Sequence, residues 1–64
     1  MWIKLTHIAN GKPVYINTMH IVSVWNCPDD DITRVSTVED VVPWQVKESV
    51  ETVINLIRMA EENT

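Results

Sequence analysis

The side chains best suited to metal binding or nucleophilic chemistry are His7, His20 and Cys27. Structural zinc needs four ligands, usually in closely spaced pairs, and these three residues are far apart in the sequence. A site built from them and one aspartate is conceivable, but no spacing supports it. Cys27 and His20 could act as nucleophile and base, yet no nearby residue would orient the base or form an oxyanion hole. We therefore expect no metal, no cofactor and no catalytic residue.

Phosphate and calcium sites are equally unsupported by the sequence. Gly11 is the only glycine, so the chain has no glycine-rich phosphate loop. The run Asp29-Asp30-Asp31 lacks the alternating ligands, the glycine and the distal glutamate of a calcium loop, and it is typical of a solvated turn. A chain of 64 residues also has little room for a pocket that encloses a substrate. The sequence therefore predicts a protein that is not an enzyme.

Large apolar side chains are abundant for a chain of this size, with three tryptophans, one tyrosine and no phenylalanine. A small core rarely buries three tryptophans completely, because each indole N–H needs a polar partner. They could form the core and its half-exposed rim, or at least one could anchor an interface, where tryptophan is enriched. The side chains expected to be available for such an interface are Trp2, Trp25, Trp44, Leu56 and Met59.

The length of the chain favours self-association. We expect one domain, residues 1–64, that buries only roughly 60% of its unfolded surface. Its core then supplies no more than about 3–5 kcal/mol of net stability. A single cysteine excludes a disulfide within the chain and is typical of a reducing compartment. No apolar run approaches the ~20 residues of a membrane span, and the N-terminus lacks the pattern of a signal peptide. We expect a cytoplasmic homo-oligomer with no membrane insertion.

The charge balance argues against nucleic acid as a partner. The formal net charge is −4, and the five lysines and arginines are scattered along the chain. Binding to a phosphate backbone draws on clustered basic residues. Folding could still gather some of them on one face, so a regulatory nucleic-acid-binding protein is kept as an alternative.

The elements that position these side chains change from strands to a helix along the sequence. Asn10-Gly11 separates two stretches of alternating apolar residues, and it predicts a tight turn with positive φ in a hairpin over residues 2–17. Further strands are expected at 20–25, 32–37 and 41–47, separated by turns at 27–31 and 39–40. Pro43 cannot donate a ladder hydrogen bond, so the last strand should be an edge there or carry a bulge.

A helix is predicted from Ser49 onward, with Ser49 as its N-cap, Glu51 in its first turn and Asn63 near its end. Its apolar stripe is expected to consist of Val50, Val53, Ile54, Ile57 and Ala60. Leu56 and Met59 lie beside this stripe, where they could cover the margin of the sheet or form a subunit contact. The expected fold is α+β, an antiparallel sheet of four to five strands that could curl toward a barrel, with one C-terminal helix packed on it.

Two ends of the chain resemble a known family. Ile3-Lys4-Leu5-Thr6, Asn10-Gly11-Lys12, Tyr15-Ile16-Asn17 and Ile21-Val22-Ser23-Val24 are similar to the opening of the FlbD-like (SwrD-type) small flagellar proteins. The segment from Val46 to Ile54 is similar to the Val-Lys-Glu-Ser segment that leads into that family's helix. The resemblance implies a small bacterial cytoplasmic protein associated with flagellar genes and motility, and it transfers no catalytic residue.

Two other interpretations remain open. The order of five strands followed by a helix is similar in layout to the carbon storage regulator family of dimeric RNA binders, although the acidic balance argues against RNA. A phage-encoded accessory protein would also fit. The sequence thus predicts a non-enzymatic interaction or accessory module, with itself and an unidentified protein as partners, and the resemblance adds a flagellar role.

Overall fold

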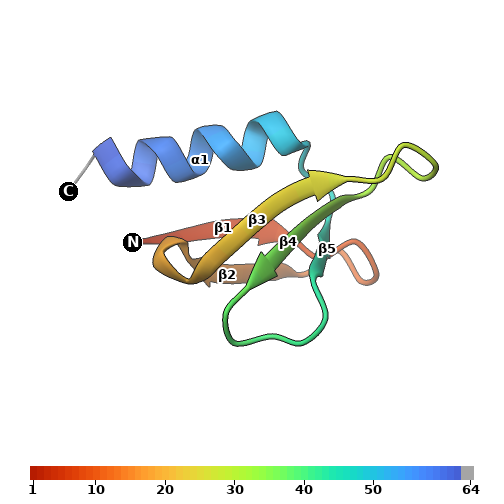
Figure 1. Cartoon of the computed structure of the whole chain (residues 1–64), viewed down its shortest axis with the longest axis horizontal. Coiled ribbons are helices and arrows are strands. Elements are labelled where there is room, and N and C mark those ends of the chain that lie inside the picture. Colours follow the sequence, from red (N-terminus) through yellow and green to blue (C-terminus); the bar gives the residue numbers. More distant parts are fainter. Residues whose placement is uncertain (63–64) are drawn as a thin grey trace.

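The computed structural model describes residues 1–62 and shows an α+β chain in which five strands precede one long helix. Figure 1 shows the strands beneath the C-terminal helix, with a short 3-10 helix between the second and third strands. The elements are β1 (Trp2–Thr6), β2 (Pro13–Asn17), η1 (Thr18–His20), β3 (Ile21–Asn26), β4 (Thr33–Thr37), β5 (Trp44–Val46) and α1 (Val50–Glu62). No helix in residues 1–62 has the length and apolar character needed to cross a membrane.

The N-terminal hairpin is confirmed, but its turn differs from the expected one. β1 and β2 pair antiparallel, with Ile3 opposite Ile16. Of the two turn residues, only Gly11 has a positive φ, of 71°. The loop is wider than a two-residue turn: the His7 amide donates to the Lys12 carbonyl at 2.8 Å, and the Gly11 amide donates to the His7 carbonyl at 2.9 Å. The prediction of a tight turn with positive φ at both Asn10 and Gly11 is wrong, because the hydrogen bonds close the loop around four residues, 8–11, and Asn10 has no positive φ.

The remaining strands form a meander in the order β3-β4-β5, all antiparallel. β3 and β4 agree with the predicted strands to within one residue at each end. β5 is much shorter than expected, since it begins only after Pro43 and leaves Val41 and Val42 in an exposed loop. The residues before β4 form the expected turn, in which Asp31 has a φ of 55°.

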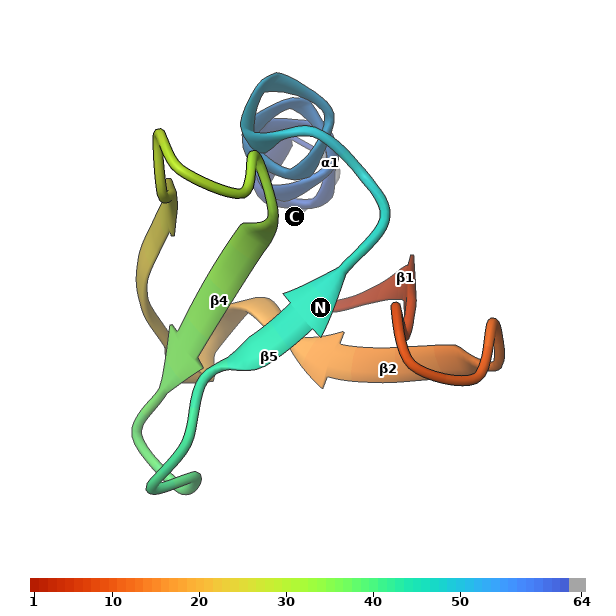
Figure 2. The same ribbon diagram turned by 90° about the vertical axis from the view of Figure 1, so that its right-hand side faces the viewer.

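The strands form two sheets, so the prediction of one sheet of four to five strands that could curl into a barrel is wrong. β1-β2 is one sheet and β3-β4-β5 is the other. They meet at a short joint, in which His7 and Val46 form an isolated bridge. The Ile8 amide donates to the Gln45 carbonyl at 3.0 Å, and the Lys47 amide donates to the Thr6 carbonyl at 2.9 Å. Figure 2 shows the end of β5 pointing toward β1, while η1 connects β2 to β3 without pairing them.

The joint stays short because the chain leaves the sheet. In the register of the His7–Val46 bridge, Leu5 would face Glu48 and Ile3 would face Val50. Residue 49 caps α1, however: the Thr52 amide donates to Ser49 Oγ at 3.1 Å, and the Val53 amide donates to the Ser49 carbonyl at 3.0 Å. The N-cap that the sequence predicts therefore ends the pairing of β1 with β5.

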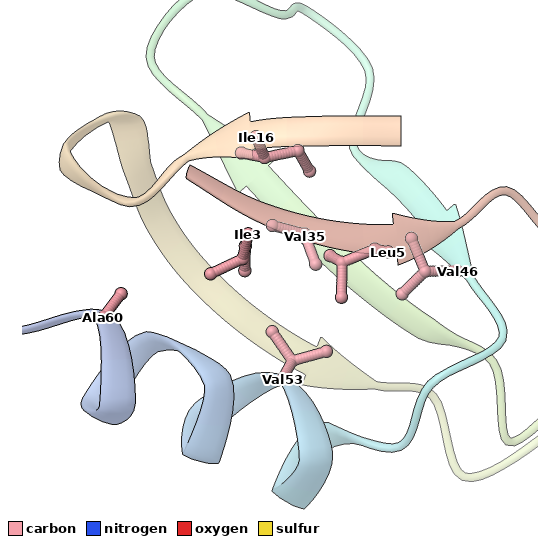
Figure 3. Packing of buried hydrophobic residues seen from close by; sticks show 7 residues of the cluster. All are labelled: Ile3, Leu5, Ile16, Val35, Val46, Val53 and Ala60. Atoms are coloured by element: carbon pink, nitrogen blue, oxygen red, sulfur yellow. The ribbon is translucent and has the colours of Figure 1, made fainter. Parts of the chain in front are cut away.

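The core lies between the two sheets and α1 (Figure 3). Its buried apolar side chains are Ile3, Leu5, Ile16, Val35, Val46, Val53 and Ala60. α1 presents Val53 and Ala60 to the sheets, with Leu56 and Ile57 half-buried beside them. The expected stripe is thus correct at Val53, Ile57 and Ala60, while Ile54 is exposed. The predicted role of Asn63 lies outside the described residues.

Candidate protein interaction surfaces

The five predicted interface residues lie in three different places. Trp2 on β1 and Trp44 on β5 line the same surface hollow. Trp25 lies on β3, opposite Arg34 of β4, and does not line that hollow. Leu56 is half-buried against the core, and Met59 is 58% exposed on α1. The structure therefore brings two of the tryptophans together and separates the other three residues from them.

The hollow around Trp2 and Trp44 is here called the aromatic groove. It is an open groove of about 260 Å³ between the outer side of the β1-β2 hairpin and the loop that joins β4 to β5. Its lining side chains combine three aromatic rings with two carboxylates and one imidazole, namely Trp2, Tyr15, Trp44, Glu39, Asp40 and His20, beside Ile16, Asn17 and Thr37. Trp2 and Tyr15 are exposed, at 65% and 59%, whereas Trp44 is half-buried.

Asp40 lines the aromatic groove and is held there by hydrogen bonds. Its Oδ2 accepts a hydrogen bond from Trp44 Nε1 at 2.8 Å and another from Thr37 Oγ1 at 2.7 Å. The Asp40 amide in turn donates to Thr37 Oγ1 at 3.2 Å. These bonds, from Thr37 first and then Trp44, lower the pKa of Asp40 below its usual value. The carboxylate is therefore held in place and kept charged, and the indole N–H of Trp44 has its polar partner.

Two histidines contact residues of the groove, and of these only His20 lines it. His20 Nδ1 lies 3.0 Å from Glu39 Oε1, and the His20 carbonyl accepts from the Val38 amide at 2.9 Å. His7 contacts the ring of Trp44, with ring centroids 5.7 Å apart and planes at 86°. An edge-on aromatic contact of this kind orients the indole ring. Trp44 is thus held by Asp40 and His7 at once.

A second surface of interest is the edge of β3. β3 pairs with β4 only, and no strand pairs with its other edge in the part of the chain that the structure describes. Its side chains include no charge and no proline, and Val22 and Trp25 are exposed. Edge strands in natural proteins usually carry charges, prolines or covering elements that block pairing with another chain. β3 lacks the first two, although its register with β4 is interrupted by a bulge at Val22 and α1 contacts the strand.

The charge nearest Trp25 is compensated. Arg34 Nη2 lies 2.7 Å from Asp30 Oδ2, and Arg34 Nη1 donates to Asp30 Oδ1 at 3.1 Å. The hydrogen bond from Arg34 lowers the pKa of Asp30 to about 2, so both partners stay ionised at neutral pH. Because Arg34 is paired with Asp30, it adds no uncompensated charge beside β3.

The side chains considered for metal binding and nucleophilic chemistry lie apart. His7 packs against Trp44, while His20 pairs with Glu39. β3 separates His20 from Cys27, and at about 3.3 Å per strand residue this places them roughly 20 Å apart. Among residues 1–62, no three His, Cys, Asp or Glu side chains gather in a way that could hold a metal ion.

Sequence reasoning missed the contributions of Tyr15, Glu39 and Asp40 to the aromatic groove. The sequence indicates only turn residues at Glu39 and Asp40, and it counts Tyr15 among the abundant aromatic side chains without placing it at an interface. The spacing of Asp40 and Trp44, which are joined by a hydrogen bond across the loop, was the one local signal. Thr37 and Glu39 also lie close to Asp40 in sequence, but the remaining lining residues come from β1, β2 and η1, so only the fold brings them to the groove.

Comparison of the chain with protein-family models, curated proteins and solved structures finds no match.

Proposed function

We propose that this protein is a non-enzymatic interaction module that forms a homodimer through the edge of β3. The observation that carries the proposal is that β3 is an unpaired edge of six residues with no charge, no proline and two exposed large apolar side chains. β2 also has an unpaired edge, but it begins with Pro13, which weakens it as a pairing template. The outer edge of β1 pairs with β5 only from Thr6 onward, and α1 contacts β1. β3 is therefore the edge best suited to accept another strand.

A second copy of the chain is the occupant that the charges favour. The net charge is −4, and most acidic residues lie in the loops 29–31 and 39–40 and on α1. Two copies that approach through these regions would repel each other, whereas β3 has no charge to oppose contact. Antiparallel pairing of β3 with itself is also two-fold symmetric, so each strand meets its own complement. Because the core is small, apolar surface buried between two copies would add to the stability of the fold.

A flagellar or motility-associated role is the finer part of the proposal. It depends on the resemblance to the FlbD-like family in the β1-β2 turn and in the segment from Val46 to Ser49. Both segments act structurally in this fold, the first closing the hairpin and the second joining β5 to α1. Gene neighbourhood is the test: adjacent flagellar genes would support the role, and adjacent phage genes would replace it with a phage accessory function.

Sedimentation velocity at micromolar concentration tests the dimer. Val22→Lys places a charge on the exposed face of β3, and we expect it to convert a dimer into a monomer, because edge lysines oppose strand pairing. Val41→Lys is the matched control, since Val41 is fully exposed in the loop 38–43, away from β3. Circular dichroism of both variants checks that the fold is kept.

Two results would overturn the proposal. One is a monomeric parent protein at this concentration. The other is a dimer that Val41→Lys dissociates and Val22→Lys does not, which would move the interface to the loop between β4 and β5.

A further inference from the structure

We propose that the aromatic groove binds the cationic side chain of an arginine or lysine from a partner protein. The inference rests on the proposed function in one respect, that this chain acts by binding proteins. It concerns a different surface from β3, because neither Val22 nor Trp25 lines the groove.

The first argument is the aromatic lining. Trp2 and Tyr15 are more than half exposed beside Trp44. Ring faces attract guanidinium and ammonium groups, and tryptophan does so most strongly. A neutral apolar ligand would also contact these rings, so the rings by themselves do not select a cation.

The second argument is the charge of the groove. Asp40 and Glu39 both line it, and none of the lysines or arginines does, although Lys4 lies opposite Tyr15 on the neighbouring strand. The hydrogen bonds of Asp40 from Thr37 and Trp44 both reach Oδ2. Oδ1 of this fixed carboxylate remains available for a further donor. Glu39 is exposed, and within the groove its carboxylate contacts only His20. The carboxylates therefore favour a cation over a neutral apolar group.

The third argument is size. A volume of about 260 Å³ corresponds to roughly nine water molecules at about 30 Å³ each. An arginine side chain has seven heavy atoms, so one such chain fills the groove, whereas most drug-sized ligands need more room. The groove is also partly open to solvent, as a side chain that enters from another protein requires.

An NMR titration tests the proposal, because the indole N–H signals report on each tryptophan separately. The probe is N-acetyl-arginine amide, and N-acetyl-citrulline amide is its neutral isostere. We expect the arginine probe to shift the signals of Trp2 and Trp44 in a saturable way, and to leave that of Trp25 unchanged. The citrulline probe should bind at least about fivefold more weakly, the factor expected for the loss of one exposed charge interaction.

Two variants with the same chemical change separate the groove from the overall charge. Asp40→Asn removes the groove charge but keeps an oxygen that can accept from Trp44 and Thr37, and it should weaken arginine binding about fivefold. Asp29→Asn removes an exposed charge from the turn at 28–30 and should leave binding unchanged. Glu39→Gln is a second groove variant in case Asp40→Asn unfolds.

Equal binding of the arginine and citrulline probes would overturn the proposal. So would equal weakening by Asp40→Asn and Asp29→Asn, or a shift of all three indole signals together. Tighter binding of spermidine than of the arginine probe would assign the groove to a free polyamine instead of a protein side chain. Failure of the β3 dimer would appear in sedimentation alone and would leave this titration unaffected.

Discussion

Glu48 connects two parts of the chain that are 42 positions apart. Its Oε1 accepts from the Thr6 amide and its Oε2 from Thr6 Oγ1, both at 2.8 Å. Partial burial by itself raises the pKa of Glu48, but the two hydrogen bonds from Thr6, together with the amide of Glu48 itself and the charge of Lys47, outweigh it and lower the pKa below its usual value. The carboxylate of Glu48 therefore continues the hydrogen bonding between the two segments at the point where backbone pairing between β1 and β5 stops.

Glu48→Gln should destabilise the protein in a pH-dependent way. Since the folded-state pKa is lowered, the carboxylate contributes fully above its unfolded pKa of about 4.3. That contribution is lost as the pH falls through the folded value. We expect a loss of about 1–2 kcal/mol at pH 7, because the amide can accept only one of the two bonds.

Urea unfolding at pH 7 and at pH 3 measures this effect. The difference between parent and variant should shrink at pH 3, which lies below the pKa of the glutamate in the unfolded chain. A difference of the same size at both pH values would show that the ionised carboxylate has no special role.

At the scale of elements, local signals predicted the hairpin, two middle strands and the helix with its cap. These elements depend on residues close in sequence, such as Gly11 and the Ser49–Thr52 pair. The separation of the strands into two sheets was not predictable in this way. It depends on the register of His7 with Val46 and on the position at which the chain leaves the sheet to begin α1. Both are determined by contacts between residues far apart in the chain.

The aromatic groove follows the same pattern. The sequence indicated that tryptophans would be too many for the core, and Trp2 is indeed exposed. Which tryptophans meet, and beside which carboxylates, depends on how β2 lies against the loop between β4 and β5. Helical spacing also placed Leu56 beside the stripe, whereas the docking angle of α1 turns Leu56 toward the core and Ile54 outward.

Gly11→Val tests the conformation of the hairpin loop. Gly11 has a φ of 71°, and a Cβ there would meet only Lys47 Nζ, at 3.7 Å, which is ordinary contact. The expected loss of about 1–2 kcal/mol therefore comes from the backbone conformation and not from a clash. Thermal unfolding should show Gly11→Asn much closer to the parent, because asparagine tolerates this conformation. Equal melting of all three proteins would mean that the loop adopts another conformation.

At the scale of the whole molecule, a handful of side chains holds the two sheets and the helix together. Leu5, Val35 and Val53 are fully buried, and they come from β1, β4 and α1 respectively. Each layer thus contributes one of the central contacts. Because the core is small, the loss of one such side chain removes a large share of the net stability.

Leu5→Ala should cost about 2–5 kcal/mol, which is comparable to the whole stability expected of a chain this size. We expect the variant to lose its cooperative unfolding transition. Ile3→Val, at about 0.5–1.5 kcal/mol, gives a graded second measurement that stays folded.

Val41→Ala serves as the control for these core variants. Val41 is fully exposed, so its truncation should change stability by less than about 0.5 kcal/mol in the same urea titration. A loss as large as that of Ile3→Val would mean that the loop between β4 and β5 is packed in solution.

The contact between Thr6 and Glu48, next to the joint, also determines the order in which the chain can fold as it is synthesised. The hairpin β1-β2 has all its pairing partners once residue 17 has left the ribosome. The contact with Thr6 can form only after Glu48 has been synthesised, and Ile3 and Leu5 can be buried only after α1 has been synthesised. At roughly 5–20 residues per second, a nascent chain spends seconds with its first apolar face open to chaperones and to neighbouring nascent chains.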